Sequence, residues 1–180
     1  MAEFYRRRLP HLQVIGQPLF ITWRLYGSLP GNRVFPETLT SGEAFVAMDT
    51  LLDQARSGPV SLKQPEIAEL VVGAIEHGEA HLKMYERRAW VVMPNHVHLL
   101  ITPLVEPARI TQTLKRFTAR EANKLLGFTG PFWQPESYDR LVRDRTEFEK
   151  TARYIQMNPV RAGLAAVPSE YPWSSAAKAD

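Results

Sequence analysis

The chain has 180 residues, of which 44% are hydrophobic, and it carries a formal net charge of +3 and a sequence pI of about 9.3. This length and composition allow one sizeable core, so we expect a single domain over residues 1–180, with a mild basic excess that suits a polyanionic partner. The absence of cysteine excludes disulfides and thiolate metal ligands, and without a signal-peptide h-region or a membrane-length apolar run we expect a cytoplasmic protein that does not associate with membranes.

The first half of the chain predicts one strand and two helices. Residues 18–27, PLFITWRLYG, are rich in β-branched and aromatic residues and precede a Gly and Pro loop, which predicts a strand. Apolar residues recur at helical spacing from Ser41 to about Arg56, with Ser41 as the expected N-cap. A second helix is predicted from Pro65, a favourable first helical residue, to about His77.

The second half predicts a hairpin followed by two helices and a short strand. Residues 86–93 and 96–103 are strand-like runs joined by a short link, Pro94 and Asn95, which is typical of a hairpin. The later elements expected are a helix from Arg109 to Leu126 that ends at Gly127, a strand within residues 137–142, a helix from Glu147 to Asn158 stopped by Pro159, and an extended, weakly ordered tail over residues 167–178. This order predicts an α+β fold, a central antiparallel sheet with helices packed on one side.

Two histidines, His96 and His98, lie at the start of the second hairpin strand, in the stretch MPNHVHLLITP. Side chains alternate along a strand, so His96, His98 and Leu100 face the same way. Two imidazoles side by side resist protonation of both and are suited to share a divalent cation. The alternative is that both are half-exposed sheet residues with water or carbonyl partners.

The last predicted helix carries Tyr154 and Asn158 one turn apart on one face. The Asn158 carboxamide is an oxygen ligand of the kind that hard divalent ions accept, so it could complete a metal site with His96 and His98. Water and a phosphate oxygen would take the remaining positions, and Tyr154 would lie within reach of the phosphorus. Taken singly, Tyr154 is better explained as a core aromatic residue and Asn158 as a polar helix-terminal group.

Three motifs follow one another in the chain: MPNHVHLLI, FWQPESYDRLVRD and YIQMNPVRAGL. In this order they resemble the single-tyrosine transposases that carry a His-hydrophobic-His motif, and most closely the REP-associated tyrosine transposases, named after repetitive extragenic palindromes. The likeness runs from about Arg6 to Trp173. One departure is an insertion between the first strand and the hairpin, so the loop contacts of compact relatives are not carried over.

The resemblance implies a ferredoxin-like fold, a Mg²⁺ or Mn²⁺ ion, and single-stranded DNA with a hairpin as the partner. It assigns the motif pair to His96 and His98, the nucleophile to Tyr154 and the third metal ligand to Asn158. The implied reaction is attack of the Tyr154 oxygen on a DNA phosphorus, giving a 5′-phosphotyrosine and a free 3′-hydroxyl, and its reversal rejoins strands without ATP. Whether the protein acts as a monomer or a homodimer, and on which hairpin, is left open.

Tyr154 would need activation, because a tyrosine of pKa about 10 is phenolate in only about one molecule in a thousand at pH 7. Arg153 and Lys150 are the candidate cations beside the metal, although Lys150 is equally well explained as surface charge.

Basic and aromatic residues elsewhere are candidates for DNA contacts. One set forms a stripe at helical spacing that could follow phosphates or could be a solvated outer face: Arg116, Arg120 and Lys124. A second set forms a basic arm that could reach a groove: Arg6, Arg7 and Arg8. Three aromatic residues could stack on unpaired bases or pack internally: Trp133, Tyr138 and Trp173.

Two other functions remain open at this point. One is a hairpin-binding protein of the same fold without efficient cleavage, against which the presence of His96, His98, Tyr154 and Asn158 together argues. The other is a metal-dependent hydrolase that uses water, which a covalent protein–DNA adduct would exclude.

Overall fold

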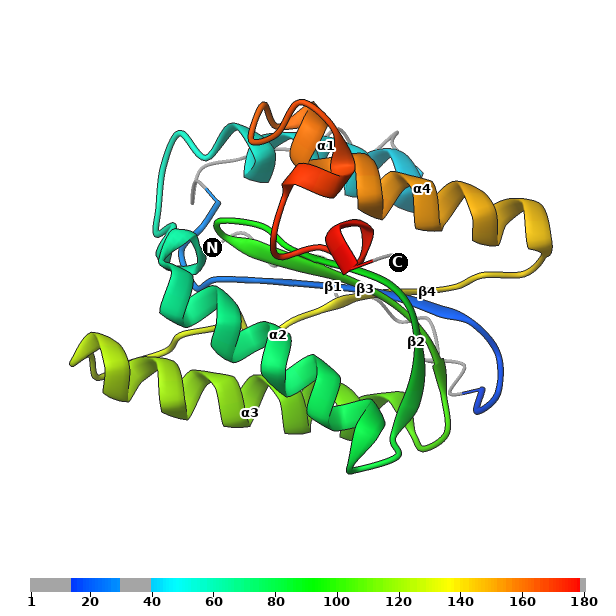
Figure 1. Ribbon diagram of the computed structural model, residues 1–180, viewed down its shortest axis with the longest axis horizontal. Helices are drawn as coiled ribbons and strands as arrows, with labels where there is room; N and C mark the ends of the chain where they lie inside the picture. The colour runs from blue at the N-terminus through cyan, green and yellow to red at the C-terminus, as the bar shows by residue number, and fades with distance from the viewer. Residues whose placement is uncertain (1–13, 30–39, 179–180) are drawn as a thin grey trace.

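The computed structural model describes residues 14–29 and 40–178, which form a sheet between two layers of helices (Figure 1). The strands are β1 (Leu19–Arg24), β2 (Tyr85–Val92), β3 (His96–Pro103) and β4 (Tyr138–Leu141). The α-helices are α1 (Ser41–Gln54), α2 (Pro65–Ala80), α3 (Pro107–Leu126) and α4 (Arg145–Arg161). Short 3-10 helices lie at η1 (Ser61–Lys63), η2 (Pro168–Glu170) and η3 (Ser175–Lys178). In this part of the chain no helix combines the length and the apolar character that crossing a bilayer requires.

The four strands form one sheet in the order β2-β3-β1-β4, and each neighbouring pair is antiparallel. The predicted hairpin is confirmed, since β2 pairs with β3 directly. Along the chain the order β1-α2-β2-β3-α3-β4 is the ferredoxin-like arrangement, in which β1 and β3 are the central strands. The predicted α+β class with a central antiparallel sheet is therefore confirmed.

Alternate residues of the central strands enter two separate cores. Trp23 and Leu99 pack in the core that includes α2 and α3, whereas Phe20 and Leu100 pack in the core that includes α1 and α4. The helices therefore cover both faces of the sheet (Figure 1), and the prediction of helices on one side is wrong for the chain as a whole. Helices α2 and α3 do lie on one side of the sheet, as predicted. However, β1 and β3 carry apolar side chains on both faces, so a second layer of helices must cover the other face.

Several helix ends differ from the sequence prediction: α2 extends to Ala80 and α3 begins at Pro107, and the start of α1 and both ends of α4 also differ. Helix α1 has Thr40 as its N-cap, not Ser41, because Glu43 forms a reciprocal capping box with Thr40. Helix α4 begins at Arg145 and continues through Pro159 to Arg161, so the proline does not stop it. Proline lacks only its own N–H donor, and the turn is closed by the bond from the Ala162 N–H to the Asn158 carbonyl at 3.0 Å.

The tail after α4 is packed against the sheet, so the prediction of a weakly ordered, extended tail is wrong. Tyr171 is buried and donates its hydroxyl to the Val92 carbonyl at 2.9 Å. The Val92 N–H donates to the Trp173 carbonyl at 2.9 Å, and Ser174 bridges to Val91. β2 is an edge strand that pairs with β3 on one side only, and the tail supplies backbone hydrogen-bond partners on its other side.

Candidate metal and nucleophile site

The two histidines of the motif lie fully buried at the start of β3, on the face covered by α1 and α4. Hydrogen bonds at the two Nδ1 atoms fix the orientation of the rings. The Nδ1 of His98 lies 2.6 Å from the Thr22 hydroxyl, and the Nδ1 of His96 lies 2.7 Å from the Asn95 amide oxygen. The two Nε2 atoms are consequently turned toward each other, 3.2 Å apart. Burial, and then the neighbouring His98, lower the pKa of His96 to about 3, so its imidazole is neutral, as a metal ligand must be.

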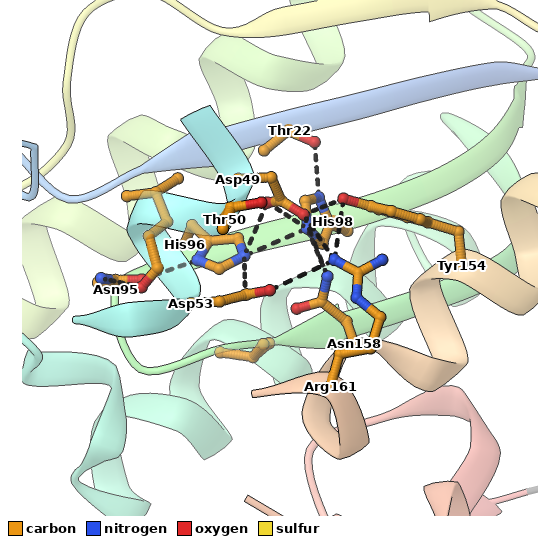
Figure 2. Close-up of polar contacts among 12 residues, drawn as sticks. Thr22, Asp49, Thr50, Asp53, Asn95, His96, His98, Tyr154, Asn158 and Arg161 are labelled. Carbon is orange, nitrogen blue, oxygen red and sulfur yellow. Dashed lines mark hydrogen bonds and ion pairs between the residues drawn. The ribbon is translucent and has the colours of Figure 1, made fainter. Parts of the chain in front are cut away.

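Asp49 of α1 completes this group (Figure 2), and sequence analysis did not identify it. Its Oδ1 lies 3.0 Å from the Nε2 of His98 and 3.3 Å from the Nε2 of His96. Ligand atoms at neighbouring positions of an octahedral ion, each about 2.1 Å from it, lie about 3 Å apart. Among the described residues, one group of carboxylate and imidazole side chains lies close enough together to bind a single metal ion: Asp49, His96 and His98.

A signal for Asp49 was present in the sequence. Phe45, Asp49 and Leu52 share one helical face, so Asp49 interrupts the apolar stripe of α1. Asp53 follows one turn later on the same side, and like charges at this spacing destabilise a helix unless a cation lies between or beside them. Burial alone would raise the pKa of Asp49, but His98, His96 and the Tyr154 hydroxyl hold it below its usual range.

Buried oxygen atoms without hydrogen-bond partners are concentrated here. Among the described residues, the buried side-chain atoms that make no hydrogen bond of good geometry include three oxygens of this one cluster: Asp49 Oδ1, Asp53 Oδ1 and Asn158 Oδ1. Within this described part of the chain, Asp49 Oδ1 has only the two imidazole nitrogens beside it, at 3.0 and 3.3 Å. A buried acceptor left unpaired costs about 1–3 kcal/mol. Acceptors that surround two imidazoles would be satisfied by a cation, so the donor set fits a divalent metal ion.

The predicted ligand Asn158 reaches this cluster from α4 and is fully buried. Its Nδ2 lies 3.3 Å from the Asp49 Oδ2 and 3.3 Å from the Nε2 of His98. A half-turn of the carboxamide exchanges nitrogen and oxygen and would direct Oδ1 toward the same point. The structure thus brings Asn158 to the histidine pair, and its role as a ligand stays a prediction.

Tyr154, one turn before Asn158 on α4, directs its hydroxyl into the same cluster and donates it to the Asp49 Oδ2 (Figure 2). Its ring packs among Phe20, Phe45 and His98, with centroid separations of 6.3, 6.2 and 5.8 Å. Burial, and then the charge of Asp49, raise the pKa of Tyr154 above its ordinary value. The hydroxyl is therefore protonated and held by a carboxylate whose other oxygen faces the histidines.

The cation that contacts Tyr154 is Arg161, which was not among the predicted cations. An Nη2 of Arg161 lies 3.4 Å from the Tyr154 hydroxyl, 3.5 Å from the Asp49 Oδ2 and 3.3 Å from the Asp53 Oδ2. Arg153 is exposed, and Lys150 lines a groove of about 470 Å³ beside Tyr154. Arg161 reaches the site because α4 continues past the proline that was expected to end it.

The predicted basic stripe lies on α3, which covers the opposite face of the sheet from Tyr154. Arg116, Arg120 and Lys124 are exposed, and the last two pair with Glu121 at 2.6 and 3.1 Å. Their predicted contact with DNA therefore stays a prediction. Residues 6–8, the predicted basic arm of Arg6, Arg7 and Arg8, lie outside the described residues.

The three aromatic residues considered for base stacking all make internal contacts. Trp133 is buried and donates its Nε1 to the Thr118 hydroxyl at 2.9 Å. Tyr138 stacks on Phe45 at 4.3 Å, and Trp173 packs against Tyr171 at 5.8 Å. Packing explains Trp133 fully, whereas Tyr138 also lines the groove beside Tyr154.

Comparison with known proteins agrees with the motifs. No family model matches the chain. A REP-associated tyrosine transposase from Escherichia coli K12 is 30% identical over 96 residues, which are 51% of this chain and 54% of that protein. The chain resembles the REP-associated tyrosine transposases, as its motifs predict. It spans about half the length of this REP-associated relative in the alignment.

The fold agrees as well. The structure of a REP-associated tyrosine transposase bound to a REP hairpin superposes with a TM-score of 0.60, covering 99% of this chain and 84% of the other. The two sequences are 19% identical in that alignment, so this likeness concerns the fold alone.

Proposed function

We propose that the protein is a metal-dependent enzyme of the REP-associated tyrosine transposase kind, which nicks and rejoins single-stranded DNA next to a hairpin through a 5′-phosphotyrosine. The observation that carries the proposal is the shared carboxylate of Asp49. One of its oxygens faces the Nε2 atoms of His96 and His98, and the other accepts the Tyr154 hydroxyl. A half-buried tyrosine hydroxyl beside a metal-binding group suits nucleophilic attack on a phosphodiester.

The residues that would hold the ion are His96 and His98 through Nε2 and Asp49 through Oδ1, with Asn158 as a further oxygen ligand. Mixed imidazole and oxygen ligands suit Mn²⁺, and Mg²⁺ accepts the oxygen ligands together with water. When bound, such an ion polarises the phosphate and stabilises charge on the leaving oxygen.

The residues of the chain supply the nucleophile and fix its orientation. The Tyr154 oxygen bonds to phosphorus while the bond from phosphorus to the 3′-oxygen breaks, and the leaving oxygen takes a proton from solvent water to become a 3′-hydroxyl. The hydrogen bond from the Tyr154 hydroxyl to the Asp49 Oδ2 orients the nucleophile. Because the neighbours of Asp49 hold its pKa below the usual range, the Tyr154 proton passes to solvent water as the bond to phosphorus forms. Because burial and Asp49 raise the Tyr154 pKa, the resting hydroxyl stays protonated until substrate reaches the site.

The partner proposed for this reaction is a DNA hairpin with a flanking single strand. The solved relative of similar fold is bound to a REP hairpin, and this chain has a sequence pI of about 9.3, which suits a polyanion. The basic residues Arg116, Arg120 and Lys124 would contact the hairpin away from the cleavage site, since α3 lies on the other face of the sheet.

A metal-dependent adduct assay tests the proposal. The protein is incubated with a strand that carries a palindromic hairpin, single-stranded flanks and a different label at each end, with Mn²⁺, with Mg²⁺ or with EDTA. The 3′ label reports the covalent adduct, and the 5′ label reports the fragment that ends in a 3′-hydroxyl. We expect a metal-dependent covalent protein–DNA band together with a product whose 3′-hydroxyl a polymerase can extend. Tight hairpin binding with no adduct under any metal condition would instead support a binding protein. Cleavage to free 5′-phosphate without an adduct would support a hydrolase.

A further inference from the structure

Arg161 occupies the solvent side of the candidate site and contacts Tyr154 in two ways. Its guanidinium carbon lies 4.3 Å from the centroid of the Tyr154 ring, within the range of a cation–π contact. Its Nη2 also lies 3.4 Å from the Tyr154 hydroxyl. The ring also packs near Phe20 and Phe45, whose ring centroids lie 6.3 and 6.2 Å from its own. Both an aromatic cluster and a planar cation therefore contact the ring.

Asp53 provides the anchor of this cation. Its Oδ2 lies 3.3 Å from the Arg161 Nη2, and its side chain is only 11% exposed. Asp49 also contacts Arg161, at 3.5 Å, but through the oxygen that accepts Tyr154. If a divalent ion neutralised the charge of Asp49, Asp53 would remain as the carboxylate paired with Arg161. The position of the guanidinium would thus be kept in the metal-bound protein.

We propose that Arg161, anchored by Asp53, is a positioning residue for the Tyr154 nucleophile. This inference rests on the proposed function for its catalytic consequence. Stacking fixes the plane of the ring, and the hydrogen bond from Nη2 to the hydroxyl fixes the direction in which the oxygen points. A donor beside the tyrosine oxygen remains a partner for it after the proton has left. A displacement of about 1 Å at a reacting atom costs about a hundredfold in rate, so loss of this clamp affects the chemical step.

The test compares Arg161→Ala and Arg161→Lys with Arg145→Ala as the matched control. Arg145 is on the same helix, but its side chain is 92% exposed and pairs only with Glu149 in the described structure. We expect Arg161→Ala to lower the single-turnover rate of cleavage about a hundredfold, and Arg161→Lys to restore little, because an ammonium group does not stack or donate in the same geometry. The Kd for hairpin DNA should stay within about twofold of wild type, as in the loss of one partly exposed contact.

Two further measurements separate positioning from other roles. Arg161→Ala should bind Mn²⁺ at least as tightly as wild type, since it lacks a cation that competes for Asp49 and Asp53. Millimolar guanidinium, far below denaturing concentration, should restore part of the cleavage rate of Arg161→Ala and should not change that of Arg145→Ala. An unchanged rate in Arg161→Ala would overturn the proposal. A rate loss matched by an equal loss of DNA affinity, without guanidinium rescue, would also overturn it and make Arg161 a DNA contact.

A probe of the ring itself tests positioning without cleavage. The protein is labelled with 3-fluorotyrosine at position 154, and its fluorine NMR signal is recorded without DNA. The signal should shift in Arg161→Ala and in Asp53→Asn and remain in place in Arg145→Ala. If the signal responds as expected but wild type forms no DNA adduct, the proposed function fails and the positioning contact stands. If the signal in Arg161→Ala equals that of wild type, the positioning proposal fails whatever the activity.

Discussion

The carboxylate of Asp49 joins His98 to Tyr154: its Oδ1 lies 3.0 Å from the Nε2 of His98, and its Oδ2 accepts the Tyr154 hydroxyl. These residues come from three different elements, α1, β3 and α4. A single side chain of α1 therefore fixes the distance between the candidate metal ligands and the candidate nucleophile. This relation makes Asp49 the residue whose loss should affect both metal binding and chemistry.

Asp49→Asn should weaken metal binding strongly. The substitution keeps the shape of the side chain but removes the charge that faces the two imidazoles. We expect the Kd for Mn²⁺, measured by calorimetry, to rise at least tenfold, in keeping with the cost of perturbing a metal site. Glu69→Gln, an exposed acidic residue of α2, is the control and should bind Mn²⁺ as wild type does. Equal affinity in Asp49→Asn and wild type would remove Asp49 from the ligand set.

His98→Ala should separate DNA binding from cleavage. The imidazole is fully buried and removed from solvent, so it is not available to contact a DNA backbone. Phosphate contacts elsewhere dominate affinity for DNA, and the Kd for hairpin DNA should be nearly unchanged. Cleavage should fall below detection in Mg²⁺ and in Mn²⁺. Metal-dependent nicking at the wild-type rate by a folded His98→Ala protein would contradict the metal assignment.

The pKa of Asp53 predicts a pH-dependent effect of Asp53→Asn on stability. Burial, and then Asp49, raise this pKa from 3.8 to about 6. The folded state therefore holds the Asp53 proton more tightly than the unfolded chain, and ionisation of Asp53 destabilises the fold as the pH rises from about 4 to 6. Asparagine removes this cost, so the variant should gain stability relative to wild type by up to about 3 kcal/mol above pH 6.5, and little near pH 4. Urea unfolding in EDTA at both pH values measures the difference. A difference that does not vary with pH would show that Asp53 titrates normally.

The basic stripe on α3 should contribute affinity without sequence selectivity. Neutralising Arg116 and Arg120 together should weaken binding to hairpin DNA and lower the salt dependence by roughly one unit of slope per lost phosphate contact. Glu121 pairs with Arg120 and Lys124, so Glu121→Gln should act in the opposite direction and strengthen binding. Titrations at several salt concentrations test both variants. An unchanged slope in both would place the stripe on a solvated surface away from DNA.

Local patterns in the sequence were sufficient to predict most of the elements and the orientation of the histidines. The alternation along β3 correctly put His96, His98 and Leu100 on one face, because a strand offers no other arrangement. Helical spacing correctly put Tyr154 and Asn158 on one face of α4, and both reach the same cluster. The second layer of helices was not predicted, since periodicity shows that a helix has an apolar face but not which side of the sheet it covers.

The acidic and basic partners of Tyr154 could not be predicted from spacing. Asp49 lies in a helix far from the histidines along the chain, and only the tertiary fold brings its carboxylate to them. An acidic residue within an apolar stripe indicates that Asp49 is buried, but it does not indicate which residues Asp49 contacts. Arg161 was missed because Pro159 was expected to end the helix, whereas a proline near the last turn removes one hydrogen bond and leaves the following residue helical.

The most direct test of the account is the comparison of wild type with Tyr154→Phe. The substitution removes one oxygen and keeps the ring that packs among Phe20, Phe45 and His98, so folding and hairpin binding should be retained. Both proteins are incubated with labelled hairpin-bearing single strands and Mn²⁺, and denaturing gels are examined for a protein-linked 5′ end. Wild type should give the covalent adduct and a free 3′-hydroxyl product, and Tyr154→Phe should give neither. If Tyr154→Phe still cleaves at the same position, another group is the nucleophile and the account is contradicted.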